Sequence, residues 1–407
     1  MIPKRQTAIV AHLGAREHYA VPVAFDSAGI LKSFYTDFYV GQLSHIFSQI
    51  PLSLQFDLFK RMLGRHCQDL NPSLVHSFPL LGVKYFWLLH RSQGVWQRRS
   101  VQLRVAKDFL RKIIARDPLE ADIIYAFDHV ALELFDRAQR PNITKVLNQT
   151  NLSLWEEAYL QNEYEKWSSW MNLEKLDYPL EFSEREQSEW ALADIIVVNS
   201  NYAKRALVSM GVPAVKLRVV PLSINTNQFY PLAERKDGPA RKFLFVGTVA
   251  IRKGIQYALQ AFKGITYPGI TFSAVGKNWL DEKVLAEFRD VCHFQGEVSR
   301  MNLLQVYNSG DVLVFPTVSD GFGIVQLEAL ACGLPVITTP NSGEVVVDGE
   351  CGFIVPVGDV EALRDRIMVL ASDRNLFAYM SINAVKRAAE FSWSAYQTRL
   401  LQAVNAA

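Results

Sequence analysis

Two acidic residues eight positions apart could carry chemistry in the stretch SDGFGIVQLEALACGLPVITT, residues 319–339. Asp320 precedes Gly-Phe-Gly, and Glu328 falls beside the apolar face of a helix predicted from about Phe322 to Cys332. A carboxylate removed from water is costly unless fixed groups donate hydrogen bonds to it. Two kinds of donor for Glu328 fit this geometry equally well: the vicinal diol of a ligand's ribose, or an arginine or backbone N–H groups of the protein.

The start of the same predicted helix could bind an anion. The helix follows a predicted strand, residues 311–317, so its free N–H groups and the positive end of its dipole lie at the carboxyl end of that strand. Gly321 and Gly323 would let a ligand approach the backbone closely. The pattern therefore predicts an anionic ligand at this loop.

A pair of basic residues stands in a similar position in KFLFVGTVAIRKGI. Gly247 ends a predicted strand, and Arg252 and Lys253 stand where the next helix should begin. Cations oppose the dipole at a helix N-terminus, so two of them together favour an anion between them and the helix, and a diphosphate could occupy both. The alternative is an exposed basic pair that is free in water.

The elements that must position these residues alternate between short β-rich runs and helical patterns, which is typical of parallel α/β units. One polar segment with Pro and Gly, residues 223–240, is predicted to be a linker. The fold class is therefore α/β, with two doubly wound, Rossmann-like domains that face a cleft and bind ligands beyond the carboxyl ends of their strands. The predicted strands are 7–12, 121–127, 145–148, 194–200 and 218–222 before the linker, and 242–247, 270–276, 293–296, 311–317, 335–339 and 352–357 after it.

Composition excludes several classes of protein. The 407 residues include 43 Lys and Arg against 41 Asp and Glu, a balance that does not indicate a nucleic-acid partner. The four cysteines form no Cys-x-x-Cys pair, so a reducing, cytoplasmic compartment fits best. No run of about 18 apolar residues predicts a spanning helix, and the first apolar run reads as a strand and not as a signal peptide.

Charge is unevenly distributed along the chain. Residues 81–116 carry nine Lys or Arg against a single acid, Asp108, with aromatic residues among them, whereas residues 151–190 carry ten acids and three bases. Basic and aromatic side chains suit the headgroup level of an anionic membrane, so residues 81–116 are the candidate for peripheral contact with the inner face of the plasma membrane. A solvated basic helix face is at least as good a reading. The aromatic residues of this stretch are Tyr85, Phe86, Trp87 and Trp96.

Together these motifs resemble the retaining, nucleotide-sugar-dependent glycosyltransferases of the GT-B fold, glycosyltransferase family 4 or "group 1". The ordered set FVGTVAIRKG, FQGEVSRMNLLQVYNSGDVLVFPTVSDGFGIVQLEALACGLPVITT and GFIVPVGD carries the resemblance. It implies an acceptor-side domain over 1–222, the linker over 223–240, a nucleotide-sugar-binding domain over 241–388, and a helix over 389–407 that crosses back to the first domain.

The resemblance also assigns roles to residues. Asp320 would meet the donor sugar near its reacting carbon, Glu328 would hold the ribose, and Arg252 and Lys253 would neutralise the leaving diphosphate. Backbone N–H groups at Phe322, Gly323 and Ile324 would meet the sugar and phosphate. The further donor-side candidates are Gly14, Gly247, Thr248, Glu297 and Gly321, and the acceptor-side candidates are Arg16, Asp128 and His129.

Three positions depart from the family pattern. Asp320 is one methylene shorter than the usual glutamate, Thr248 stands where many relatives have an arginine, and Phe127 stands where many have a histidine. Arg252 would then have to carry the role of the missing arginine.

The resulting hypothesis is a hexosyltransferase that moves a sugar from a nucleotide-diphosphate donor, UDP- or GDP-linked, to a glycan or lipid-linked acceptor with retention at the anomeric carbon. No Asp-x-Asp pair or histidine cluster has metal-ligand spacing, so no metal and no cofactor is expected. Two rivals stay open: a non-hydrolysing epimerase or a phosphorylase of the same fold, and a catalytically silent nucleotide-sugar-binding or scaffold protein.

Overall fold

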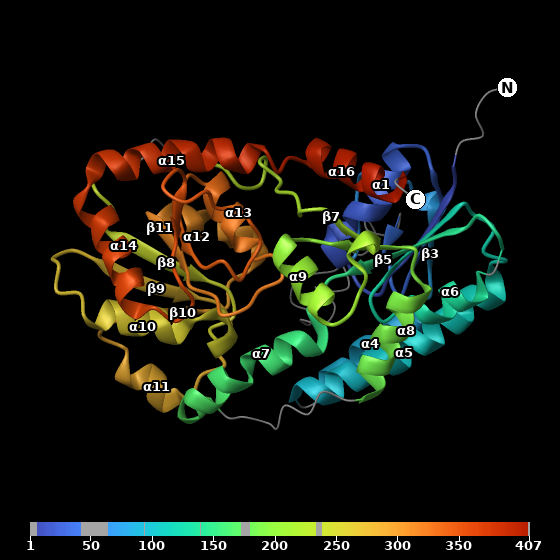
Figure 1. Ribbon diagram of the computed structural model, residues 1–407, viewed down its shortest axis with the longest axis horizontal. Helices are drawn as coiled ribbons and strands as arrows, with labels where there is room; N and C mark the ends of the chain where they lie inside the picture. Colours follow the sequence, from blue (N-terminus) through green and yellow to red (C-terminus); the bar gives the residue numbers. More distant parts are fainter. Residues whose placement is uncertain are drawn as a thin grey trace, which may run out of the picture.

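Two parallel sheets form the framework of the protein. The structure is a computed structural model and describes residues 6–41, 64–92, 94–138, 140–171, 180–232 and 238–405. One sheet lies in each half of the molecule (Figure 1), with strand orders β3-β2-β1-β4-β5-β6-β7 and β10-β9-β8-β11-β12-β13. Each sheet begins near its centre, at β1 or β8, and the chain winds outward in both directions, so both are doubly wound. The predicted α/β class is confirmed.

The elements have the following bounds. The strands are β1 (Ala8–Ala11), β2 (Leu31–Thr36), β3 (Val75–Ser77), β4 (Ile123–Phe127), β5 (Thr144–Gln149), β6 (Ile195–Val198), β7 (Leu217–Val219), β8 (Lys242–Val246), β9 (Thr271–Val275), β10 (His293–Gly296), β11 (Val312–Phe315), β12 (Val336–Thr338) and β13 (Gly352–Ile354). The helices are α1 (Ala20–Ser27), α4 (Pro79–Arg91), α5 (Gly94–Arg116), α6 (Leu132–Arg137), α7 (Ser153–Lys166), α8 (Leu180–Leu192), α9 (Asn201–Ser209), α10 (Ile255–Lys263), α11 (Glu282–Glu287), α12 (Leu303–Ser309), α13 (Val325–Ala331), α14 (Val360–Ser372), α15 (Arg374–Ala389) and α16 (Trp393–Asn405). Short 3-10 turns are η1 (Arg16–Tyr19), η4 (Pro72–Leu74), η5 (Ser168–Trp170), η6 (Ala214–Lys216), η7 (Ile251–Lys253) and η8 (Arg300–Asn302).

The strands are recognisable in the sequence where both faces are covered by helices. All five residues of β4, with the sequence IIYAF, are buried, as expected for a strand in the middle of a parallel sheet. Every predicted strand overlaps an observed one, but β2 and β3 were missed. The sequence of β2, LKSFYT, mixes polar and apolar residues, and β3 has only three residues.

Residues 233–237 of the predicted linker and the side chain of Trp96 lie outside the described residues. The helix predicted from about Phe322 begins instead at Val325, because Gly323 adopts the left-handed conformation with φ of 72° and interrupts the helical backbone before it.

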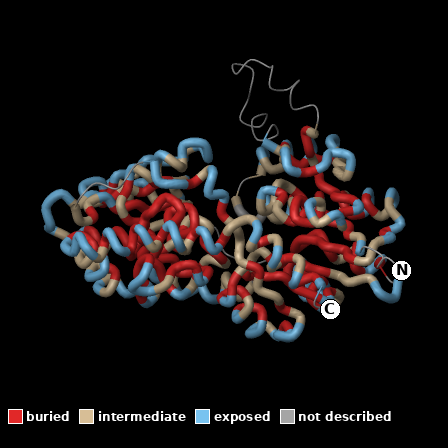
Figure 2. Tube along the Cα trace, turned by 90° about the horizontal axis from the view of Figure 1, so that it is seen from above, coloured by how far each residue is buried: buried red, intermediate tan, exposed pale blue. Residues whose placement is uncertain are grey.

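Each sheet has its own core, and Figure 2 shows the buried segments gathered in two groups. Tyr396 and Leu400 of α16 belong to the core of the first sheet, and α16 lies against α1 (Figure 1). A segment of the first half also reaches the second. Leu160 of α7 is buried in the core of the second sheet, although α7 lies in the chain between β5 and β6 of the first sheet. Two segments thus cross between the halves.

His12 is buried at the carboxyl end of β1. Its ring is fully covered and packs against Phe34 and Phe127 with centroid distances of 4.7 and 5.1 Å. Burial, reinforced by the nearby charge of Arg16, lowers the pKa of His12 to about 3. In the unfolded chain the His12 imidazole therefore takes up a proton near pH 6.5. In the folded chain the same imidazole stays neutral until a much lower pH.

We expect His12 to make the protein less stable in mild acid. Between pH 7 and pH 5 the free energy of unfolding should fall by about 2 kcal/mol on account of this residue alone, since only the unfolded state takes up the proton. His12→Phe should remove that part of the pH dependence. Urea unfolding of both proteins at the two pH values checks it, and parallel losses in both would contradict the prediction.

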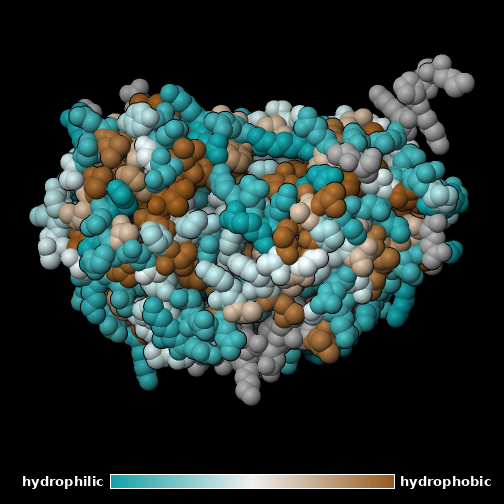
Figure 3. Space-filling model, viewed as in Figure 1, coloured by the Kyte–Doolittle hydropathy of each residue, from teal (hydrophilic) through white to brown (hydrophobic). Residues whose placement is uncertain are grey.

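No helix among the described residues is long and apolar enough to cross a membrane. The face in Figure 3 shows hydrophobic residues in separate patches among hydrophilic ones.

Candidate active site

A cavity of about 290 Å³ lies at the carboxyl ends of β8 and β11. These strands are neighbours at the point where the chain of the second sheet reverses its winding direction, which is where doubly wound folds bind ligands. Residues of both halves line it, so the cavity faces the first domain across the cleft. The lining residues are Thr150, Asn199, Leu222, Val246, Gly247, Lys253, Phe315, Asp320, Gly321, Phe322, Gly323, Ile324 and Val325.

The loops after β8 and β11 are in direct contact, and this contact brings the basic and the acidic candidates together. Gly254 has a φ of 75°, and a Cβ atom there would lie 1.8 Å from the carbonyl oxygen of Pro316. Only glycine permits this approach. It sets Lys253, from the first loop, beside Asp320 of the second.

Lys253 and Asp320 form an ion pair at the edge of the cavity, and their side chains are only 15% and 17% exposed. The Oδ1 atom of Asp320 also accepts hydrogen bonds from the backbone N–H groups of Gly323 at 3.1 Å and Phe322 at 3.4 Å. Burial alone would raise the pKa of Asp320, but the charges of Lys253 and Arg252 hold it below its usual value. Burial lowers the pKa of Lys253 in spite of its partner. Two of the N–H groups expected to meet a ligand thus donate to Asp320 in this structure.

Arg252 is directed differently from Lys253. Its Nη1 atom lies 3.3 Å from Oε1 of Glu156 on α7 and donates to the carbonyl oxygen of Ser319 at 3.1 Å. Arg252 does not line the cavity. Of the predicted basic pair, Lys253 alone reaches it in this structure.

Glu156 is a site residue that the sequence reasoning missed. Besides Arg252, its Oε1 atom accepts a hydrogen bond from the Ser319 hydroxyl at 2.7 Å. The Tyr202 hydroxyl of α9 donates to the same Ser319 oxygen at 3.0 Å. The loop that carries Asp320 is therefore held by two helices of the first half. The sequence offered only the acidic character of residues 151–190 as a signal.

Glu328 is buried, with 3% of its surface exposed, on α13. Its Oε2 atom accepts a hydrogen bond from the hydroxyl of Tyr307 on α12 at 2.7 Å. Burial raises the pKa of Glu328, although Tyr307 acts in the opposite direction. The protein thus supplies a partner, a tyrosine hydroxyl, that was not among the donors considered, and Glu328 does not line the cavity.

The remaining donor-side candidates are dispersed. Gly247 lines the cavity with a φ of 136°, whereas Thr248 is half-buried and Glu297 is exposed, and neither lines it. Gly14 donates its N–H to Asp37 at 2.7 Å and also stays outside the lining.

The acceptor-side candidates reach the cavity through Thr150. The Thr150 hydroxyl donates to Asp128 at 2.9 Å and lies 3.3 Å from Nη1 of Arg16. His129 is buried, with its Nε2 atom 3.6 Å from Glu186, and burial lowers its pKa to about 4. Arg16 and Asp128 thus adjoin the cavity, whereas His129 lies behind Asp128 in the interior.

No metal site is evident within the described ranges, where no three His, Cys, Asp or Glu side chains are grouped as metal ligands. The chemistry that the geometry offers is stabilisation of negative charge by Lys253 and, across the loop contact, by Arg252.

This architecture is that of the GT-B glycosyltransferases. Over 99% of its length the chain superimposes on 99% of the sucrose-phosphate synthase of Thermosynechococcus elongatus, with a TM-score of 0.68 and 19% identity. It also covers all of WaaG, a glycosyltransferase involved in lipopolysaccharide biosynthesis, with 98% of its own length, a TM-score of 0.61 and 14% identity. Anabaena HepE in complex with UDP superimposes over its full length on 99% of this chain, with a TM-score of 0.63 and 15% identity. These likenesses establish the fold.

The second half resembles a known family. Residues 228–387 match the family described as glycosyl transferases group 1. A stretch of 151 residues, 35% of the chain, is 34% identical to the capsular polysaccharide biosynthesis glycosyltransferase CapM of Staphylococcus aureus and covers 40% of it. A stretch of 230 residues, 50% of the chain, is 29% identical to the D-inositol 3-phosphate glycosyltransferase of Corynebacterium jeikeium and covers 55% of that protein. The chain thus matches about half the length of these relatives, and the resemblance inferred from the motifs is confirmed.

Proposed function

We propose that the protein is a retaining, metal-independent glycosyltransferase that transfers a hexose from a nucleotide-diphosphate donor to a glycan or lipid-linked acceptor in the synthesis of a cell-surface polysaccharide or glycolipid. One observation carries the proposal: the Lys253–Asp320 pair stands at the cavity where the loops after β8 and β11 meet. A developing diphosphate charge at that point would find a buried ammonium group. HepE, a structural neighbour, binds UDP and UDP-glucose, which supports a uridine donor.

The transfer needs little from the protein beyond positioning and charge. The bond between the anomeric carbon and the diphosphate oxygen breaks, the acceptor hydroxyl oxygen bonds to the same face of that carbon, and the acceptor proton is released. The leaving diphosphate gains negative charge as the bond breaks, and Lys253 would stabilise it most strongly at that stage. Asp320 would then face the sugar, and Thr150, Arg16 and Asp128 would lie on the acceptor side.

A thermal-shift panel of UDP, GDP, ADP and their sugars tests the donor class. A ligand at 100 times its Kd should stabilise the protein by about 2.7 kcal/mol. With the donor that binds, glycoside should form in step with nucleotide release, and EDTA should leave the rate unchanged. Conversion of the nucleotide sugar to its epimer without net nucleotide release would favour the epimerase, and formation of a sugar phosphate from a glycan and inorganic phosphate would favour the phosphorylase. Absence of binding to every nucleotide would favour the silent scaffold protein.

Peripheral membrane contact through residues 81–116 forms part of the proposal. The candidate surface for this contact is the exposed face of α4, a face that begins one residue before that stretch, at Leu80. Leu80, Val83 and Trp87 are 89%, 46% and 48% exposed and lie on one face of the helix, whereas Tyr85 and Phe86 are buried. Several of the bases have acidic partners. These ion pairs are Lys84–Asp108, Arg111–Asp108, Lys107–Glu181 and Arg99–Glu157.

We expect the double variant Leu80→Glu/Trp87→Glu to lose binding to vesicles that contain anionic lipid. It removes the two most exposed apolar side chains of α4 and adds two charges that anionic headgroups repel. Tyr379→Glu/Ile382→Glu is the matched control, because these residues of α15 are 52% and 60% exposed on the other half. Flotation with vesicles measures both. Equal losses in the two variants, or no binding by the original protein, would contradict the membrane surface.

A further inference from the structure

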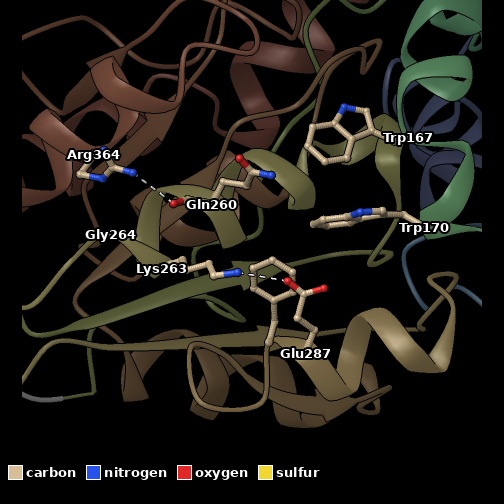
Figure 4. A pocket seen from close by; sticks show the side chains of 8 residues that line it. Trp167, Trp170, Gln260, Lys263, Gly264, Glu287 and Arg364 are labelled. Carbon is tan, nitrogen blue, oxygen red and sulfur yellow. Dashed lines mark hydrogen bonds and ion pairs between the residues drawn. The ribbon is translucent and has the colours of Figure 1, made fainter.

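A second pocket lies away from the cleft, where η5 and the end of α7 meet α10, α11 and α14 (Figure 4). Its volume is about 480 Å³, within the range of about 300–1,000 Å³ typical of small-molecule sites. The residues that line it are Trp167, Trp170, Gln260, Lys263, Gly264, Glu287, Phe288 and Arg364. None of them was singled out by the sequence or used in the proposed transfer.

Aromatic rings form one wall of this pocket. The rings of Trp167 and Trp170 meet edge to face with centroids 4.8 Å apart, and Trp170 packs on Phe288 at 5.3 Å. The backbone fixes this wall, since the Trp170 carbonyl accepts the N–H of Asp281 at 2.8 Å and the Trp170 N–H donates to Trp167 at 2.9 Å. The rings are thus held in place before any ligand arrives.

Polar side chains face the rings across the pocket, as Figure 4 shows for Gln260, Lys263 and Glu287. Lys263 is 3.1 Å from Glu287 and lies over the Phe288 ring. Arg364 donates to the backbone carbonyls of Ala261 at 3.1 Å and Gln260 at 3.3 Å, and it is ion-paired with Glu361. Both cations therefore already have acidic partners.

This distribution of charge selects among ligand classes. A phosphate or carboxylate would have to compete with Glu287 and Glu361 for the two cations, and a purely apolar ligand would bury the polar wall without hydrogen bonds. A neutral polyhydroxyl ring suits both walls, because its C–H face packs on an indole and its hydroxyls donate and accept.

We propose that this pocket binds a neutral oligosaccharide segment, remote from the point of transfer. The link to the cleft is α10, which begins two residues after Lys253 and ends at Lys263, a pocket residue. Nine helical residues span about 14 Å, so α10 sets the separation between Lys253 and the pocket, and Gln260 and Lys263 are the two residues of this helix that are not buried. That the glycan is the acceptor or product of this protein rests on the proposed function, whereas the binding chemistry of the pocket does not.

The test measures binding of neutral oligosaccharides, namely maltohexaose, cellohexaose and laminarihexaose, by calorimetry and by tryptophan fluorescence. At least one should bind the full chain, and Trp170→Ala should weaken it roughly tenfold or more. Because Trp170→Ala also loses packing, Lys263→Ala/Glu287→Ala provides a second variant: these side chains are 59% and 58% exposed, and their loss should weaken binding several-fold without unfolding the protein. Tyr379→Ala, at an exposed aromatic residue of α15 that lines neither pocket, should bind as before.

Three outcomes would overturn the proposal: no binding to any of the three oligosaccharides, unchanged binding in both pocket variants, or binding of inorganic phosphate that the pocket variants abolish. Failure of the proposed function would look different. In that case the nucleotide panel gives no thermal shift while oligosaccharide binding, sensitive to Trp170→Ala, persists.

Discussion

Replacing Lys253 with alanine should lower kcat by about 10²- to 10³-fold, with a much smaller change in KM. Its ammonium group is buried at the cavity and fixed by Asp320, so it would act on the diphosphate charge that develops as the bond breaks, without the cost of reorganising water. Steady-state kinetics with the donor identified by the nucleotide panel measures the effect. Lys253→Arg keeps the charge and should retain more activity than the alanine variant.

Because Lys253 is paired with Asp320, a loss of catalysis in the Lys253 variant can be distinguished from a loss of stability. Lys253→Ala leaves the Asp320 carboxylate without its cation, so the pKa of Asp320 should rise and the melting temperature should fall. Asp320→Asn/Lys253→Ala removes the unpaired charge and should recover part of the stability but none of the activity. Asp320→Ala alone should lower turnover more than donor affinity. Recovery of activity in the double variant would contradict a direct role for Lys253.

The sequence was sufficient to predict that the two loops of the site lie close together. Parallel strands of one sheet end at the same edge, so a basic pair after 242–247 and an acid after 311–317 had to approach each other if those strands were neighbours. They are neighbours, and Lys253 and Asp320 are in contact. The continuous apolar runs that mark buried strands were enough for this step.

The partners that come from other parts of the chain could not be predicted. Glu156 stands 96 residues before Arg252 and 163 before Ser319, and their contact depends on how α7 lies across the cleft. No local pattern encodes that placement. Leu160 and Trp167 of the same segment look like ordinary helix and loop residues in the sequence, yet they pack against the core of the second sheet. The predicted boundary at 222 follows chain order and does not describe this exchange.

Local backbone geometry was a further feature of the site that could not be predicted from the sequence. Helical periodicity placed Phe322 inside a helix, whereas the left-handed Gly323 delays the helix to Val325 and lets Asp320 accept two backbone N–H groups. A glycine in a sequence permits such a turn but does not require it. In the folded protein a Cβ atom at Gly323 would lie 2.7 Å from the Phe315 ring, a contact that no local pattern in the sequence reveals.

Replacing Glu328 with alanine should weaken nucleotide diphosphate binding about 10- to 100-fold, the loss of one or two hydrogen bonds to a charged group. The expectation holds if Glu328 accepts the ribose hydroxyls in addition to the Tyr307 hydroxyl that already bonds to Oε2. Calorimetry with the diphosphate that stabilises the protein measures it. The 2′-deoxy nucleotide should bind the original protein more weakly than the ribonucleotide, and Glu328→Ala should lose that distinction.

Tyr307→Phe separates the ribose role from a purely structural one. This variant removes the protein's own donor to Glu328 and leaves the carboxylate in place, so it should lower the melting temperature while nucleotide affinity changes little. If Glu328 instead serves only to hold Tyr307 in the core, both variants lose stability and neither changes the preference for ribose over 2′-deoxyribose. Glu328→Gln is a third informative variant. Its side-chain amide can still accept a hydrogen bond from Tyr307, but it is a weaker acceptor than a carboxylate for the hydroxyls of a diol. Stability near that of the original protein with weakened nucleotide binding in this variant would assign the buried carboxylate to the ligand.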